Sequence, residues 1–303
     1  TIMRAAPAAL LAARAAGRDQ PTPADVAAAL AETPDPRLEG LATRISLSDR
    51  SERPQLDALA DAELDALARR CTLREALADH AGAGPGGLGV RALFSGPSGT
   101  GKTMAARHLA RLLGRELWRI DLSAVVSKYI GETEKALDRA LAAAESRDII
   151  LLLDEGDALM ARRTDVGNAN DRYANLETNF LLQRLEDFAG IIIVTTNAAE
   201  RIDTAFARRM DVVVPFRPPD AALRAAILKG LLAGSDVSPG QLGEVAARCT
   251  LTGGQLRNIG LHARLLGLSA GRAPGDADLL HAVTREYRKD GGHSPLKPPI
   301  GAR

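Results

Sequence analysis

The eight residues Gly96 to Thr103 read Gly-Pro-Ser-Gly-Thr-Gly-Lys-Thr, and they constrain the fold more than any other segment of the chain. They fit the pattern G-x-x-x-x-G-K-[ST] and lie between the apolar run 90–94 and the helical stretch 104–110. Glycines let backbone N–H groups turn inward around phosphate oxygens, and the following helix adds the positive end of its dipole. Such a pattern also arises by chance in glycine-rich loops, but its two flanking elements favour a phosphate-binding loop.

Two side chains of this phosphate loop, residues 96–103, have the chemistry for a nucleoside triphosphate. Lys102 can reach the terminal phosphates, and Thr103 can offer its hydroxyl to Mg²⁺. The loop therefore predicts a nucleoside triphosphate with Mg²⁺, bound between a strand and a helix.

The composition of the whole chain narrows the class of protein. Its 303 residues are enough for one large and one small domain, and a net charge of +1 gives no global sign of nucleic acid or anionic lipid as partner. No apolar run of about 18 residues occurs, so the sequence predicts no membrane span. Cys71 and Cys249 lack the spacing of metal ligands and predict free, partly buried thiols in a reducing, cytoplasmic compartment.

Apolar runs alternate with helical patterns from residue 90 onward. The strand-like runs are 90–95, 116–122, 149–154, 190–196 and 212–216, and the helical stretches between them are 101–113, 131–146, 171–187 and 201–208. Runs that are apolar throughout, such as 149–153, indicate strands buried on both faces. The chain is therefore predicted to have an α/β fold, a parallel five-stranded sheet between helices.

Prolines after the last strand separate this unit from a purely helical region. Residues 45–218 predict the large α/β domain, and 219–290 predict a small all-helical lid. Residues 1–44 predict a helical segment, the remnant of a longer N-terminal region if the chain, which begins with Thr, is a fragment. Residues 291–303, rich in Pro and Gly, predict a flexible tail.

Polar residues follow two of the buried strands. Asp154 can hold Mg²⁺ through water, and Glu155 can orient and deprotonate the attacking water. An Asp-Glu pair can equally cap the next helix, so this interpretation depends on the phosphate loop. Asn197, at the end of the next strand, can fix the same water or simply form a turn. Together these residues favour hydrolysis of the nucleotide over binding alone.

Arg208 and Arg209 lie at the end of the fourth helical stretch. Arginine stabilises the charge that develops on a transferring phosphoryl group. Because this pair lies past the sheet, we expect it to reach the nucleotide of a neighbouring subunit rather than its own, which requires an oligomer. A solvated arginine pair at a helix end is the ordinary alternative.

With these motifs in order, residues 45–290 resemble the AAA+ ATPases, specifically the AAA subgroup of ring-forming protein remodellers. The resemblance makes 96–103 the Walker A motif, 151–155 Walker B, Asn197 sensor 1, and 251–259 the sensor 2 region. It assigns catalytic roles to Lys102, Glu155, Asn197, Arg208, Arg209 and Arg257. It assigns contacts with the nucleotide to Gly96, Pro97, Ser98, Gly99, Thr100, Gly101, Lys102, Thr103, Met104, Asp154, Asn197, Gly254 and Arg257, and the metal to Thr103 and Asp154.

The segment 127–135 resembles the first pore loop of that subgroup. The resemblance implies that Tyr129 and Ile130, with Lys128 and Gly131 beside them, grip an extended polypeptide in a central channel. An aromatic ring can grip any sequence through its apolar area. Tyr129 and Ile130 can instead pack under the following helix, although their charged neighbours argue against simple burial.

A narrower resemblance lies at 171–175, which is similar to ATPases associated with phage-tail-like contractile injection systems. Residues 166–171 occupy the place of a second pore loop.

The sequence as a whole predicts a homo-oligomer, a hexamer by resemblance, that hydrolyses ATP with Mg²⁺ and remodels or threads protein. Arg209 enters the site in trans, and Arg257 couples the γ-phosphate to the lid. Two alternatives stay open. One is a nucleic-acid motor or loader, which would prefer basic pore residues. The other is an ATP-gated assembly factor or scaffold of a contractile injection particle.

Overall fold

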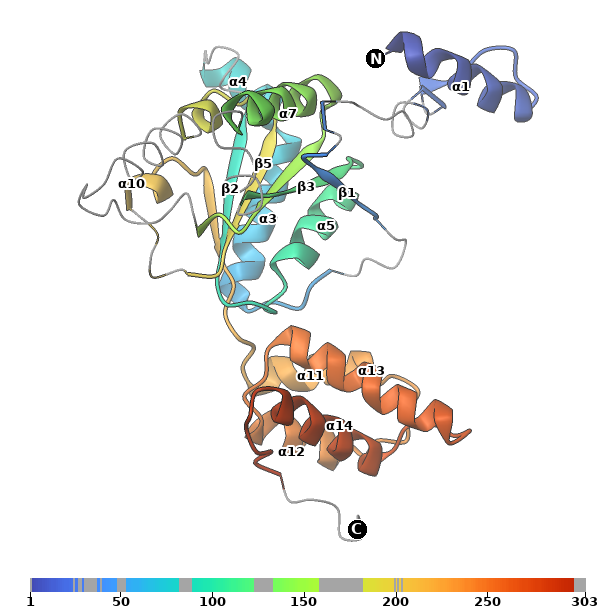
Figure 1. The fold of residues 1–303 in the computed structure, drawn as a ribbon, viewed down its shortest axis with the longest axis vertical. Coiled ribbons are helices and arrows are strands. Elements are labelled where there is room, and N and C mark those ends of the chain that lie inside the picture. Colours follow the sequence, from blue (N-terminus) through green and yellow to red (C-terminus); the bar gives the residue numbers. More distant parts are fainter. Residues whose placement is uncertain are drawn as a thin grey trace.

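The computed structural model describes residues 2–23, 25–26, 29, 37–38, 40–47, 53–81, 89–122, 133–157, 182–198, 200, 202 and 204–296. Its centre is a six-stranded sheet with strand order β1-β3-β4-β5-β2-β6 (Figure 1). Five of these strands are parallel and coincide with the five predicted apolar runs: β2 Val90–Ser95, β3 Leu117–Asp121, β4 Ile150–Asp154, β5 Ile191–Thr196 and β6 Val212–Pro215. The predicted parallel α/β sheet is thereby confirmed.

A sixth strand, β1 Thr43–Ile45, pairs antiparallel with β3 at the edge of the sheet. The sequence patterns did not indicate it. It is only three residues long and its side chains are exposed or half-buried, so no apolar run marks it. The sheet is therefore mixed at this edge rather than purely parallel.

Helices cover both faces of the sheet because its central strands are apolar on both sides. Ile150 and Leu152 of β4 belong to the cluster under α3 Ala58–Thr72 and α5 Lys102–Leu112. Leu151 and Leu153 belong to the opposite cluster, which contains the buried face of α7 Thr133–Arg147. Two shorter helices also lie in this part, α4 Arg74–Ala81 and α10 Thr204–Ala207. The carboxyl ends of the parallel strands form the edge where the phosphate loop lies.

Four helices after the sheet form the lid and pack around an apolar core of their own, beneath the sheet in Figure 1. They are α11 Ala221–Leu231, α12 Pro239–Arg248, α13 Gly253–Ser269 and α14 Asp276–Lys289. The side chains of Asp220, Ser238 and Thr252 accept hydrogen bonds from backbone N–H groups in the first turns of three of these helices. These caps fix where the three helices begin, while the domain limits stay predictions.

Residues 291–296 differ from the predicted flexible tail. Leu296 is 6% exposed and belongs to the lid core, and Arg248 Nη2 donates to the carbonyl oxygen of Pro295 at 2.6 Å. The Pro- and Gly-rich composition of this segment predicted flexibility. Composition alone does not show that one residue, Leu296, packs into the apolar core of the lid. Residues 297–303 lie outside the described part of the chain.

The N-terminal residues form α1 Ile2–Ala15, which contains Pro7. Ala9 packs with Ala29 and Val26 in a small separate cluster, and Arg18 pairs with Asp25 at 2.6 Å. Within the described residues no helix is both long enough and apolar enough to cross a membrane. Both cysteines are buried and free, as predicted.

Candidate nucleotide-binding site

The phosphate loop after β2 has a backbone that only glycine adopts easily. Gly96, Gly99 and Gly101 have φ values of 147°, 76° and 107°. A Cβ at Gly96 would lie 1.9 Å from the carbonyl oxygen of Phe216, and one at Gly99 would lie 2.9 Å from Thr252 Oγ1. Positive φ therefore favours glycine at all three positions, and close neighbours also require it at Gly96 and Gly99.

Lys102 opens α5 and is 8% exposed. Its Nζ donates to the carbonyl oxygens of Gly96 at 2.6 Å and Pro97 at 3.0 Å, and to Asn197 Oδ1 at 2.9 Å. Burial lowers the pKa of Lys102 from its ordinary value, and the charge of nearby Asp154 opposes that shift. These three oxygens are uncharged, so an anionic phosphate would be a stronger partner for this ammonium group.

Asp154 lies at the carboxyl end of β4 and is held from both neighbouring strands. Thr195 Oγ1 of β5 donates to Asp154 Oδ1 at 2.5 Å. On the other side, Nη1 of Arg119 in β3 lies 3.7 Å from Asp154 Oδ2. Thr103 is half-buried on the first turn of α5. A carboxylate and a hydroxyl are the donors that Mg²⁺ accepts beside water and phosphate, so these residues fit the metal.

Glu155 follows directly and is exposed, with a φ of 57°. Its backbone N donates to Asp154 Oδ1 at 3.3 Å. Positive φ is unusual for a glutamate, and strain of this kind collects at functional sites. The strand therefore ends on a backbone conformation that sets Glu155 apart from the regular sheet.

Two further residues beside the candidate site belong to no sequence motif. Thr195 is 2% exposed, and its hydroxyl holds the carboxylate of Asp154. Thr196 is 1% exposed; its hydroxyl donates to Asp157 Oδ1 and accepts from the backbone N of Ala198 at 3.1 Å. The available signal was a pair of hydroxyl residues at the end of an otherwise apolar strand.

The lid touches the phosphate loop through backbone atoms. Gly254 N donates to the carbonyl oxygen of Gly99 at 2.8 Å, and a Cβ at Gly254 would lie 3.2 Å from the Cα of Gly99. Thr252 and Gln255 form a capping box that fixes the start of α13 at this contact. Arg257 is exposed on the first turns of the same helix.

Arg208 and Arg209 lie at the opposite end of the sheet from the phosphate loop. They precede β6, and the backbone N of Asp211 donates to the carbonyl oxygen of Arg91, near the start of β2, at 2.8 Å. Five residues separate Arg91 from Gly96, roughly 16 Å along a strand at about 3.3 Å per residue. Neither arginine can therefore reach the phosphate loop of its own chain, as the sequence predicted.

The predicted pore residues Lys128, Tyr129, Ile130 and Gly131 lie outside the described residues, as does the segment 166–175. The described helix α7 begins at Thr133, shortly after them.

Comparisons with known proteins agree with this geometry. Residues 92–218 match the family model described as "ATPase family associated with various cellular activities (AAA)". The chain is 37% identical over 147 residues to an uncharacterized AAA family ATPase, y4kL, of Sinorhizobium fredii, which covers 47% of this chain and 44% of that protein. It is 35% identical over 206 residues to the ATP-dependent zinc metalloprotease FtsH 3 of Sphaerobacter thermophilus, covering 64% and 41%. The chain thus spans less than half the length of these curated relatives.

Among solved structures, the chain resembles the crystal structure of the FIGL-1 AAA domain with a TM-score of 0.60 and 19% identity, covering 82% of this chain and 91% of that one. The same domain in complex with ADP gives a TM-score of 0.61 at 20% identity, covering 86% and 89%. At this identity the similarity concerns the fold.

Proposed function

The chain contains an AAA ATPase domain, and from this premise we propose that it is one subunit of a ring that uses ATP hydrolysis to remodel or thread protein. Hydrolysis of ATP is the activity of such a domain. The observation that supports a ring assembly is the position of Arg209, at the end of the sheet opposite to the phosphate loop of its own chain. A complete active site would then need a second copy of the chain, a hexamer by family resemblance.

ATP with Mg²⁺, when bound, supplies the γ-phosphoryl group that is transferred to water. Lys102 would exchange its present oxygen partners for phosphate oxygens, and the loop glycines would direct backbone N–H groups at the same anion. Thr103 and Asp154 would hold Mg²⁺. Thr195 supports this role, because its hydroxyl fixes Oδ1 of Asp154 and so sets the orientation of the carboxylate.

Glu155 would accept the proton of the attacking water at its carboxylate, and Asn197 would orient that water. The Lys102–Asn197 hydrogen bond of 2.9 Å supports the placement of Asn197 beside the terminal phosphate. Arg257, with Gly254 on the same helix, would report the state of the γ-phosphate to the lid. Arg208 or Arg209 of the adjacent copy would stabilise the charge of the transition state.

Substitution Glu155→Gln tests the base assignment. The variant should bind ATP with wild-type affinity, because its amide keeps the shape of the side chain, while hydrolysis falls by about 10²-fold or more. Fluorescent-nucleotide binding and phosphate release measure the two properties separately. Near-normal phosphate release by this variant would remove Glu155 from the mechanism.

Protein is the substrate class that the available observations favour. The curated relatives include a 26S proteasome regulatory subunit 10B of Dictyostelium discoideum, 32% identical over 153 residues and covering 47% of this chain and 39% of that protein. Together with the aromatic Tyr129 in the predicted pore loop, this supports a polypeptide track over the nucleic-acid alternative. Cytoplasmic location stays a prediction from the free cysteines.

Tyr129→Ala separates threading from scaffolding. If polypeptide is pulled through a pore, unfolding of a tagged reporter protein should fail while basal ATP hydrolysis persists, because the ring loses its aromatic grip. A scaffold of a contractile injection particle would keep its assembly function in this variant. Stimulation of hydrolysis by DNA, lost at raised salt, would instead favour the nucleic-acid motor.

A further inference from the structure

We propose that Arg91 and Glu186 are positioning residues that hold the guanidinium of Arg209 ready to enter the nucleotide site of a neighbouring copy. The inference rests on the function proposed above for Arg209. Neither positioning residue belongs to a motif recognised in the sequence. Each contacts the segment around Arg209 directly.

A single guanidinium joins the two segments that support Arg209. Arg91 Nη1 donates to the backbone carbonyl oxygen of Glu186 at 2.8 Å. Arg91 Nε donates to Asp211 Oδ2 at 3.1 Å, and the backbone N of Arg91 donates to the same oxygen at 2.9 Å. Because Asp211 lies two residues after Arg209, Arg91 fixes the separation between the turn that carries Arg209 and the backbone at Glu186.

The side chain of Glu186 then contacts Arg209 itself. Arg209 Nε donates to Glu186 Oε1 in an ion pair. A carboxylate at Nε restricts the rotation of the planar guanidinium, whose terminal nitrogens carry further donors that a phosphate group can accept from. The contact with Glu186 is therefore compatible with a second, phosphate contact and sets the direction in which the terminal nitrogens face.

The side chains of this cluster differ in their exposure to solvent. The side chains of Asp211 and Arg91 are 12% and 19% exposed, so their ion pair is largely shielded from water. The side chains of Arg209 and Glu186 are 40% and 43% exposed. The Arg91–Asp211 pair is therefore shielded, while Arg209 and its partner Glu186 remain accessible to another molecule.

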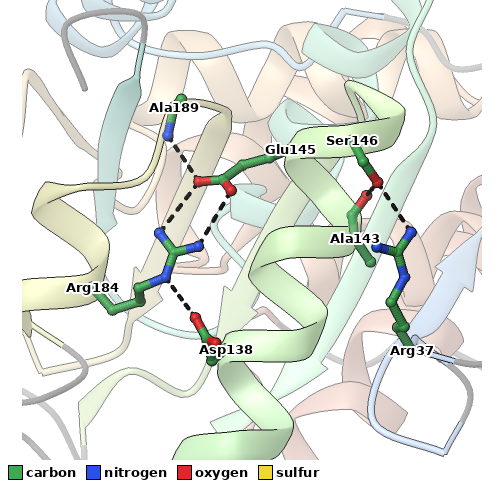
Figure 2. Close-up of polar contacts among 7 residues, drawn as sticks. All are labelled: Arg37, Asp138, Ala143, Glu145, Ser146, Arg184 and Ala189. Carbon is green, nitrogen blue, oxygen red and sulfur yellow. Dashed lines mark hydrogen bonds and ion pairs between the residues drawn. The ribbon is translucent and has the colours of Figure 1, made fainter. Parts of the chain in front are cut away.

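The segment that carries Glu186 is anchored from its other side as well (Figure 2). Arg184 Nε donates to Asp138 Oδ1 at 2.8 Å, and its Nη2 donates to Glu145 Oε2 at 3.2 Å, both on α7. The backbone N of Ala189 donates to Glu145 Oε1 at 3.1 Å. Residues 184–189 are thus fixed to α7 as well as to β2, so Glu186 is a firm support for Arg209.

The kinetics of Glu186→Ala, Arg209→Ala and the double variant test the proposal, with Glu244→Ala as a matched control. Glu244 forms an ion pair of similar exposure with Arg248 on the lid. Arg209→Ala should lower kcat by about 10³-fold. Glu186→Ala should lower kcat by about 10- to 100-fold with an unchanged KM for ATP, because the arginine is misplaced. The double variant should match Arg209→Ala, and the control should match the wild type.

Arg91→Lys tests the second positioning residue. Lysine keeps a cation beside Asp211 but cannot bridge to the carbonyl of Glu186 with a fixed fork, so kcat should fall about 10-fold with an unchanged KM. Thermal melting of each variant should stay near the wild-type value, which separates misplacement from unfolding.

The possible failures are distinguishable. Wild-type kcat in Arg209→Ala would overturn the proposed role of Arg209 and the positioning proposal with it. A large loss in Arg209→Ala without a loss in Glu186→Ala would overturn the positioning proposal alone. A gain of activity in Glu186→Ala would also overturn it, because Glu186 would then restrain Arg209 instead of presenting it. A further loss in the double variant would show that Glu186 acts elsewhere.

Discussion

The glycine at position 96 offers a test of the phosphate loop in which the structure sets the magnitude. Gly96→Ala would place a Cβ 1.9 Å from the carbonyl oxygen of Phe216, about 1.5 Å inside ordinary contact. That carbonyl belongs to a rigid backbone, since Phe216 N donates to the carbonyl oxygen of Ser95 at 2.6 Å. The clash therefore cannot be relieved by rotating a side chain.

Two terms add at this position. A φ of 147° is a conformation that side chains rarely adopt, and such strain costs about 1–3 kcal/mol. Forcing a methyl group into a filled space costs about another 1–3 kcal/mol. The free energy of unfolding should therefore fall by about 2–6 kcal/mol, a large part of the stability of an ordinary domain.

Gly101→Ala is the matched control. Gly101 has a φ of 107°, but a Cβ at this position would meet no heavy atom within 4 Å, so only the strain term of about 1–3 kcal/mol applies. Urea unfolding followed by the fluorescence of the single tryptophan, Trp118 on β3, measures both variants. Equal losses in the two variants would contradict this prediction, because the contact with Phe216 would then contribute nothing.

Three further predictions follow from buried contacts. Thr195→Val removes the hydroxyl behind Asp154 and should raise the Mg²⁺ concentration for half-maximal hydrolysis by about 10-fold, measured by metal titration; an unchanged midpoint would remove Thr195 from the metal site. Burial raises the pKa of Cys71 to about 12, so its thiol should resist alkylation at pH 8 until urea unfolds the chain. Because the unfolded thiol ionises first, stability should fall as the pH rises from about 9 toward 12, and rapid labelling of native protein would contradict the burial. Leu296→Ala should destabilise the lid by about 2–4 kcal/mol in calorimetry, while a flexible residue there would show no loss.

Sequence patterns predicted the elements whose signals are local. The run 149–153 is apolar throughout because β4 is buried on both faces. The AAA resemblance drawn from the ordered motifs is confirmed by the family match at residues 92–218. The individual roles assigned to site residues stay predictions, although the structure brings Lys102 and Asn197 into contact.

Local sequence patterns do not predict contacts between segments that are distant in the chain. The strand 43–45 is too short and too exposed for a period-2 signal. The bridge from Arg91 to Glu186 joins residues 95 positions apart, and nothing in either local sequence marks its partner. Thr195 likewise became a site residue only when the sheet placed it beside Asp154.

The phosphate loop and Arg209 lie at opposite ends of one sheet, and this limits how copies of the chain can assemble. The phosphate loop follows the carboxyl end of β2, whereas Arg209 lies near its amino end, roughly 16 Å away at about 3.3 Å per residue. If Arg209 acts in trans, one copy presents its amino edge where the next presents its carboxyl edge, so the contact uses two different surfaces. Such a heterologous contact closes only as a ring or continues as a filament, whereas a two-fold dimer uses the same surface twice.

A heterologous contact of this kind also sets the mass of the active species. Sedimentation with ATP and Mg²⁺ should show hydrolysis rising together with a closed assembly larger than a dimer, since each site takes its arginine from the next copy. The Arg209→Ala variant should assemble into particles of similar size and hydrolyse slowly, because it keeps the remaining contact surface. Full activity in a dimeric or monomeric fraction would contradict the placement of Arg209 in a neighbouring site.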